Sequence, residues 1–142
     1  MIFTAKSLKD LPLIANQIIS LVGENAIICF DAKMGSGKTT LIKHLIEILS
    51  ANKFIGSPTF TIANEYNSKN GGKISHLDLY RIEKKEELFD LNLDYYLDES
   101  DYCFIEWPEK SISFLPNDTF WVYIRIEEDQ SRTIRIENDH KP

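Results

Sequence analysis

The sequence predicts an α/β domain with three layers, a mixed and partly parallel central sheet, and a C-terminal antiparallel hairpin. Three observations lead to this fold class. The apolar run Ala26–Phe30 comes directly before a glycine-rich loop and a helix with apolar periodicity. A second apolar run, Tyr102–Glu106, ends in an acid, and Phe120–Ile126 alternates apolar and polar-tipped residues. Continuous apolar runs suit strands that helices cover on both faces.

Length and composition are those of one globular unit. The chain has 142 residues, no repeat and no linker-like stretch, so residues 1–142 are predicted to form a single domain with a loose tail of a few residues. The net charge is −6, and no block of Lys and Arg stands out. Because phosphate contacts need clustered cations, the chain is not expected to grip nucleic acid by itself.

The sequence predicts a cytoplasmic protein without a membrane partner. The N-terminus lacks a basic region followed by a long apolar core, and no window is apolar enough to span a bilayer. Cys29 and Cys103 lie in apolar runs without metal-like spacing. Buried, reduced thiols are therefore expected at both positions.

In the N-terminal half the pattern is helix, strand, loop, helix. Apolar residues at steps of three and four follow Ser7, a plausible N-cap, and end near Gly23. After the Ala26–Phe30 strand and the glycine loop, a second amphipathic helix is expected from about Lys38 to Ser50. Strand, glycine loop and helix follow one another as a P-loop NTPase fold requires.

The C-terminal half predicts mostly strands. The loop 98–101 is expected to lead into the Tyr102–Glu106 strand, which Trp107-Pro108 ends because proline cannot continue a ladder. The other elements expected are strands at Thr59–Tyr66 and Lys73–Tyr80 with a turn at 67–72 between them, a short helix at Lys84–Leu91, and a hairpin of Phe120–Ile126 with Arg132–Ile136.

The stretch FDAKMGSGKTTL nearly spells a phosphate-binding loop. Gly35 and Gly37 can turn backbone N–H groups inward to form an anion nest, and the following helix adds its N-terminal partial charge. Lys38 would reach the β- and γ-phosphates, and the Thr39 hydroxyl would bind Mg²⁺. An ordinary glycine turn before a helix is the competing interpretation.

Ala32 stands where the strict pattern G-x-x-x-x-G-K-[ST] has its first glycine. That position lies at the strand exit and outside the nest, so it needs only a small residue. We therefore expect Ala32 to be tolerated, with a negative φ. ATP is favoured over GTP, because the guanine-reading pattern N-K-x-D is missing: Asn52-Lys53 lacks the acid and comes too early.

Two acids are candidates to hold Mg²⁺ or orient water. Glu106 follows four apolar or aromatic residues, and Asp78 follows the apolar positions of a predicted strand. A surface acid is the alternative for each. His76 is expected to be structural, and Arg81 could pair with phosphate or form a plain salt bridge. Thr59 lies in a segment that could close over the γ-phosphate or simply form a turn.

Four motifs together resemble one protein family. GSGKTT, SPTFTIANEY, HLDLYR and FIEWPEK, in this order and spacing, resemble the bacterial TsaE (YjeE) family of small P-loop ATPases. Family members usually read G-x-L-G-[AS]-G-K-T-T, so Ala32 and Met34 depart from the pattern. The resemblance covers nearly the whole chain.

The resemblance implies a Mg²⁺-dependent ATPase that serves formation of threonylcarbamoyladenosine in tRNA. It implies action in a complex with TsaB and TsaD, with tRNA contacted only indirectly through that complex. Lys38, Asp78 and Glu106 are then the catalytic residues, and Thr39, Glu106 and Asp78 serve the metal. The nucleotide-binding residues implied are Lys33, Met34, Gly35, Ser36, Gly37, Lys38, Thr39, Thr40, Thr59 and Trp107.

Two rival functions are weighed against this one. A small-molecule kinase with such a loop commonly carries an arginine-rich lid, and none is evident here. A non-catalytic nucleotide-binding scaffold has less need of positioned carboxylates such as the predicted pair. Slow turnover by the chain alone is expected, because no obvious arginine finger is present in cis.

Overall fold

The computed structural model describes residues 1–58 and 61–138, and their strands form one seven-stranded sheet of order β1-β7-β6-β2-β5-β4-β3. The strands are β1 (Ile2–Ala5), β2 (Ala26–Ala32), β3 (Ala63–Asn67), β4 (Lys73–Asp78), β5 (Tyr102–Glu106), β6 (Phe120–Ile126) and β7 (Arg132–Asn138). The helices are α1 (Leu11–Val22), α2 (Lys38–Leu49), α3 (Glu86–Leu91) and α4 (Leu93–Glu99), with 3₁₀ turns η1 (Leu8–Asp10) and η2 (Pro108–Phe114).

The centre of the sheet is parallel and its two sides are antiparallel. β2 pairs in parallel with β5 and β6, and β5 pairs in parallel with β4. The antiparallel strands β7 and β1 extend one side, and β3 extends the other. The prediction of a mixed, partly parallel sheet with a C-terminal hairpin is confirmed.

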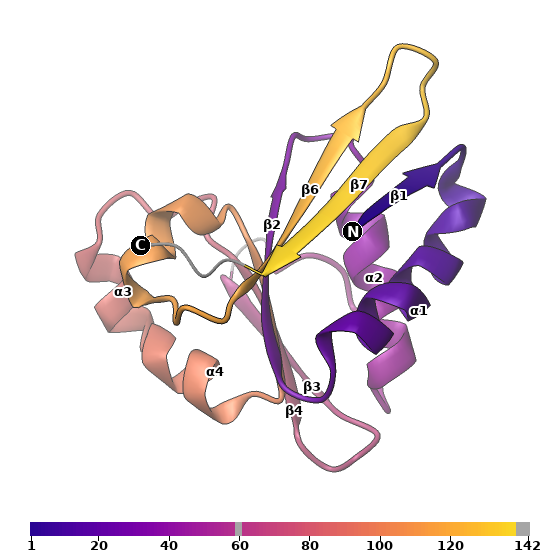
Figure 1. Ribbon diagram of the computed structural model, residues 1–142. Coiled ribbons are helices and arrows are strands. Elements are labelled where there is room, and N and C mark those ends of the chain that lie inside the picture. Colours follow the sequence, from indigo (N-terminus) through magenta and orange to yellow (C-terminus); the bar gives the residue numbers. More distant parts are fainter. Residues whose placement is uncertain (59–60, 139–142) are drawn as a thin grey trace.

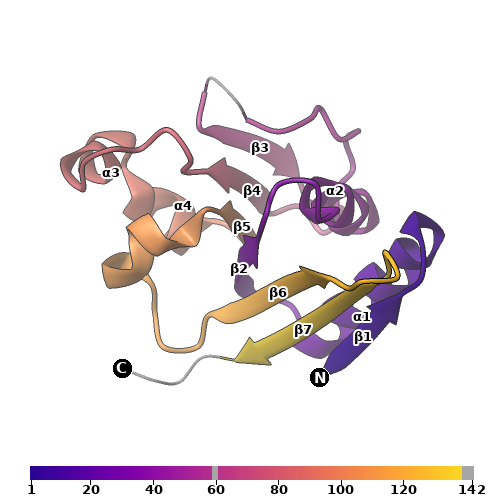
Figure 2. The same ribbon diagram turned by 90° about the horizontal axis from the view of Figure 1, so that it is seen from above.

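Helices cover both faces of the sheet, which makes three layers. Figure 1 shows α1 and α2 on one side and α3 and α4 on the other, and Figure 2 shows the same arrangement from above. The first pair buries Ile18 and Leu45 against Phe30 in one apolar core. The second pair buries Leu88 and Leu93 with Ile105 in another. The single-domain assignment of residues 1–142 stays a prediction.

The first helix begins later than the sequence indicated. The Ser7 side chain accepts a hydrogen bond from the Lys9 amide and forms a capping box with Asp10. That box caps the 3₁₀ turn η1, and the α-helix begins at Leu11, with Pro12 in its first turn, where proline lacks no needed donor. The predicted end is confirmed, since Gly23 terminates α1 with a φ of 82°.

The strand predicted over Thr59–Tyr66 is wrong at its start. β3 begins at Ala63, and Ile62 has a φ of 68°, a left-handed conformation that a strand cannot contain. Ile62 instead accepts the Asp78 amide hydrogen bond at 2.8 Å. Residues 59 and 60 lie outside the described part of the chain, so the expectation for Thr59 is untested.

The sequence analysis predicted neither β1 nor α4, and several of the predicted ends moved. β1 has only four residues, too few for a period, and it is recognisable only through its pairing with β7. The predicted loop 98–101 is partly wrong, because Asp98 and Glu99 end helix α4. In addition, β4 ends at Asp78 and not Tyr80, α3 begins at Glu86, and β7 runs on to Asn138. The expected tail at 139–142 lies outside the described residues.

Two further predictions concern the cysteines and membrane-spanning segments. Cys29 and Cys103 are both buried, as expected, and burial raises the pKa of the Cys103 thiol. Across the residues described here, no helix is long and apolar enough to cross a bilayer.

Truncating the central aromatic pair should destabilise the protein. Phe104 is fully buried on β5 and lies edge-on to Phe30, with ring centroids 6.1 Å apart. We expect Phe104→Ala to lower the free energy of unfolding by about 3–5 kcal/mol, measured by urea denaturation. Phe89→Ala, at a side chain that is 64% exposed, is the control and should cost less than about 1 kcal/mol. Equal losses in the two variants would contradict this view of the core.

Candidate functional site

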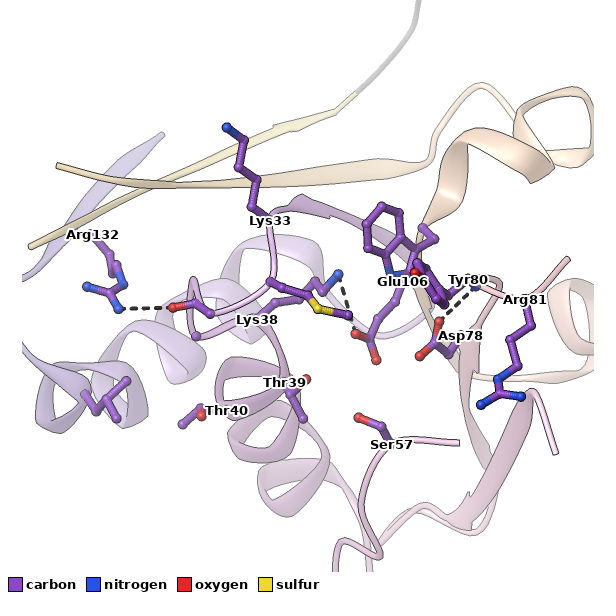
Figure 3. A pocket seen from close by; sticks show the side chains of 15 residues that line it. Lys33, Lys38, Thr39, Thr40, Ser57, Asp78, Tyr80, Arg81, Glu106 and Arg132 are labelled. Carbon is purple, nitrogen blue, oxygen red and sulfur yellow. Dashed lines mark hydrogen bonds and ion pairs between the residues drawn. The ribbon is translucent and has the colours of Figure 1, made fainter. Parts of the chain in front are cut away.

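The carboxyl ends of three parallel strands open into a cavity of about 620 Å³. Ligands bind at this edge of open α/β sheets, because the loops that follow the strands surround it. Figure 3 shows the lining side chains, with the glycine loop on one side and the acids on the other. The lining residues are Leu8, Lys33, Met34, Gly35, Gly37, Lys38, Thr39, Thr40, Ser57, Asp78, Tyr80, Arg81, Glu106, Trp107 and Arg132.

The glycine loop joins β2 to α2 with the backbone geometry that the sequence predicted. Gly35 and Gly37 have φ angles of 80° and 95°, which only glycine adopts without strain. Ala32 is the last residue of β2 and is not among the described residues with a positive φ. Its predicted place at the strand exit is therefore confirmed, and a glycine is not needed there.

Lys38, the first residue of α2, has three neighbours in the pocket. Its Nζ donates to the Ala32 carbonyl oxygen at 3.3 Å and lies 3.7 Å from Glu106 Oε1. The same ammonium group lies 4.7 Å from the centre of the Trp107 ring. Lys38 is only 7% exposed, so its charge is stabilised by these groups and not by bulk water.

Glu106 ends β5 and is 3% exposed. Its Oε2 lies 2.6 Å from Nε2 of His76, and its Oε1 faces Lys38. A buried carboxylate without partners would be costly, and these two contacts supply the compensation. The expectation that His76 is a structural histidine therefore misses its direct contact with a predicted catalytic acid.

Asp78 lies directly beside Glu106, because the two residues are register partners of β4 and β5. Its Oδ1 accepts a hydrogen bond from the Tyr80 amide at 3.0 Å. Burial raises the pKa of the Asp78 carboxyl, and the neighbouring Glu106 charge acts in the same direction. The two predicted acids thus form an adjacent pair at the edge of the same pocket.

Trp107, the residue after Glu106, has a strained backbone conformation. Its φ of 56° and ψ of 55° are left-handed, which is unusual for a bulky residue. The turn places the indole beside Tyr80, with centroids 5.0 Å apart, and under the Lys38 ammonium. Pro108 then begins η2, so the chain leaves the sheet at once.

Arg132 is a pocket residue that sequence analysis placed only on the C-terminal hairpin. Its guanidinium donates to the carbonyl oxygens of Ser36 at 3.0 Å and Gly35 at 3.3 Å. These bonds hold the outer side of the glycine loop. Leu8, Ser57 and Tyr80 were also not predicted to line the pocket, although Ser57 and Tyr80 stand in the motifs SPTFTIANEY and HLDLYR.

Not every predicted residue points into the cavity. Figure 3 shows the Lys33 side chain directed away from Lys38, whereas the Met34 side chain lines the cavity and is 74% exposed. The Ser36 side chain is buried, and its hydroxyl has no hydrogen-bond partner within the described structure. Thr59 lies outside the described residues. The nucleotide roles of these residues remain predictions.

Three oxygen-bearing side chains suit a hard cation. Thr39, Asp78 and Glu106 line one pocket, and Figure 3 shows Thr39 between the loop and the acids. Outside residues 59–60 and 139–142, the chain has no group of three or more His, Cys, Asp or Glu side chains that could hold a metal ion. Mg²⁺ usually takes one or two carboxylates and completes its shell with phosphates and water, so the residues fit that mode.

Comparison with known proteins identifies the family. The family described as "Threonylcarbamoyl adenosine biosynthesis protein TsaE" matches residues 5–134. The chain belongs to the TsaE family. The match spans the glycine loop and both acids, and it includes every residue that lines the pocket described above.

Individual TsaE relatives agree over most of the chain. The tRNA threonylcarbamoyladenosine biosynthesis protein TsaE of Haemophilus influenzae is 34% identical over 123 residues, covering 86% of this chain and 77% of that protein. The TsaE protein of Aquifex aeolicus is 32% identical, covering 92% of this chain and 91% of that protein. The crystal structure of Bacillus subtilis YdiB superposes with a TM-score of 0.76 at 25% identity, covering 94% of this chain and 82% of that one.

Removing the Asp78 charge should stabilise the fold. Because burial raises its pKa, the folded state binds a proton more tightly than the unfolded chain does. The free energy of unfolding therefore falls as pH rises from the ordinary pKa of about 3.9 through the raised value. We expect Asp78→Asn to be more stable than wild type at pH 7, with a flatter pH profile, in urea titrations. Asp90→Asn, at an exposed position, should change neither quantity.

Restoring the missing glycine should bring no gain. Ala32→Gly places a flexible residue in β2, where φ does not require it. We expect a loss of about 0.5–1 kcal/mol in the free energy of unfolding. The affinity for ATP, measured by calorimetric titration, should change by less than about twofold. A large rise in affinity would show that the alanine methyl group distorts the loop.

Proposed function

We propose that this chain is a Mg²⁺-dependent, ATP-binding and ATP-hydrolysing protein with a P-loop NTPase fold, required for threonylcarbamoyladenosine formation in tRNA. The observation that carries the proposal is the meeting of Lys38, Asp78 and Glu106 at one pocket beside a phosphate-loop backbone. The names of the TsaE relatives support the role in threonylcarbamoyladenosine formation, and the residues of the pocket support ATP binding and hydrolysis.

Each group has a role in phosphoryl transfer to water. The N–H groups of the glycine loop and the start of α2 would bind the phosphates, with Lys38 on the β- and γ-phosphates. Bound Mg²⁺, held by Thr39 and by one or both of the acids, would neutralise charge on the phosphates. Glu106 or Asp78 would accept a hydrogen bond from the attacking water and orient it. A scaffold that only binds nucleotide has no use for this pair of acids.

The contacts of Lys38 predict low activity in the chain alone. With its ammonium group held by Glu106, Ala32 and Trp107, nucleotide binding has to redirect it toward phosphate. Arg132, which lines the pocket, is engaged with loop carbonyls and is not directed at a γ-phosphate. Slow turnover alone and faster turnover with a partner would follow.

The partners in this proposal are TsaD and TsaB. A net charge of −6 disfavours direct grip on tRNA, so the complex would hold the RNA. The exposed Met34 and Tyr80, 74% and 54% exposed at the pocket, offer apolar contact area to a protein that seats there. A cytoplasmic location is part of the same proposal.

Charge-removing variants in the pocket test the ATPase directly. We expect Lys38→Ala to weaken ATP binding and Glu106→Gln to lower kcat by about 10²–10³ while nucleotide affinity changes little. Lys43→Ala and Glu47→Gln, at exposed positions of α2, are the matched controls and should behave as wild type. Phosphate release is measured for the chain alone and with TsaB and TsaD added.

The same assay can refute the proposal. No hydrolysis by wild type under either condition would eliminate the ATPase, and ATP binding without hydrolysis would favour a scaffold. Transfer of the γ-phosphate to a small metabolite would favour a kinase.

A further inference from the structure

His76 is a fully buried side chain in the middle of β4, two residues before Asp78. One ring nitrogen contacts the Glu106 carboxylate, while the ring stacks on Phe54, with centroids 6.1 Å apart and an angle of 28° between the planes. A buried polar ring between an acid of the pocket and an aromatic residue from a loop is not required by the packing of the sheet. The other buried positions of the same strand hold Ile74, Ser75 and Leu77, and none of these is a titratable ring.

The contact with Glu106 defines the tautomer of the ring. A carboxylate oxygen only accepts, so Nε2 of His76 carries the hydrogen and donates it across 2.6 Å. The other nitrogen, Nδ1, is buried and has no hydrogen-bond partner among the described residues. A hydrogen on Nδ1 would be a buried donor without an acceptor, which favours the tautomer with hydrogen on Nε2 alone.

This hydrogen bond divides the two oxygens of Glu106. Oε2 is held by His76 from within the sheet, which leaves Oε1 on the side of Lys38 and the cavity. Short hydrogen bonds to a charged acceptor are stronger and more directional than neutral ones. The carboxylate therefore has one anchored oxygen and one oxygen that faces the reacting groups.

Phe54 links the same ring to the segment that brings Ser57 to the pocket. Phe54 also stacks on Tyr66, with centroids 6.3 Å apart and an angle of 9°. The Ile55 amide donates to the Tyr66 hydroxyl at 3.1 Å, which fixes this segment on β3. Ser57 lines the cavity three residues beyond Phe54. Phe54 therefore contacts both Tyr66 and His76, and this stack of three rings positions the segment and the imidazole together.

We propose that His76 is a positioning residue that aims Glu106 at the reaction centre, and that Phe54 holds the imidazole from the loop side. The inference rests on the proposed ATPase function. Movement of the segment 51–58 would then alter the direction of Glu106 through two contacts, Phe54 with His76 and His76 with Glu106. The alternative is that His76 only fills space in the sheet, where a side chain of equal size would serve as well.

Two substitutions at one position separate these views. His76→Gln keeps an N–H donor near the place of Nε2, and His76→Leu removes it while retaining bulk. We expect His76→Leu to lower kcat by about 10–100-fold, with KM for ATP changing less than threefold, and His76→Gln to recover most of that loss. A structural role predicts equal effects of the two substitutions on kcat, or none. Urea titrations establish that each variant is folded.

A third variant addresses the loop side of the ring. Phe54→Leu should lower kcat in the same direction but by less than His76→Leu. In the double variant Phe54→Leu/His76→Leu the loop substitution should add nothing further, because both act through one carboxylate. Fully additive effects on kcat would refute the link between the loop segment and Glu106.

A spectroscopic measurement tests the geometry without any turnover. In wild-type protein with ¹⁵N-labelled imidazoles, His76 should show a hydrogen on Nε2 and none on Nδ1, and His76→Gln assigns its signals among the three histidines. Glu106→Gln should shift the Nε2 signal, while Asp90→Asn should not. The Nδ1–H tautomer, or no response to Glu106→Gln, would overturn the inference. A wild type without hydrolysis but with the expected spectrum would refute the ATPase and leave the positioning of Glu106 supported.

Discussion

The site depends on one buried carboxylate. Glu106 is 3% exposed, and a charge so far from water must be compensated by hydrogen bonds and opposite charge. Lys38 supplies the charge from the start of α2, and His76 supplies the donor from the neighbouring strand. Three elements far apart in sequence, β4, β5 and the glycine loop, are held in register around this group.

Parallel pairing is what makes that convergence possible. β2, β4 and β5 run in the same direction, so their carboxyl ends reach one edge of the sheet together. Glu106 has a register partner on each side: Asp78 of β4 and Phe30 of β2. Phe30 lies two residues before the end of β2, where the glycine loop begins. If β4 or β5 shifted by one residue in the sheet, its acid would face the apolar core on the other side. Burial of the apolar residues on both faces therefore specifies the register.

Function is associated here with locally unfavourable structure. Trp107 is left-handed directly after β5, and burial raises the pKa of the Asp78 carboxyl, so the fold disfavours its charged form. Both residues line the pocket, and locally unfavourable structure of this kind clusters at functional sites in proteins generally. The C-terminal hairpin contributes as well: Arg132 at the start of β7 holds two carbonyls of the glycine loop.

The sequence by itself determined the strand–loop–helix unit, the two acids and the C-terminal hairpin, because each depends on local signals: apolar runs, glycine spacing and alternation. Ala32 could be interpreted in the same way, since its tolerance follows from its place at the strand exit. The tertiary structure decided what local signals do not encode. β1 exists only through its partner strand, Ile62 breaks the predicted strand, and Arg132 and His76 meet the site from distant segments. The physical reason is that burial and hydrogen bonding depend on which segments pack against each other. Local patterns in a single sequence do not show which distant segments will be in contact.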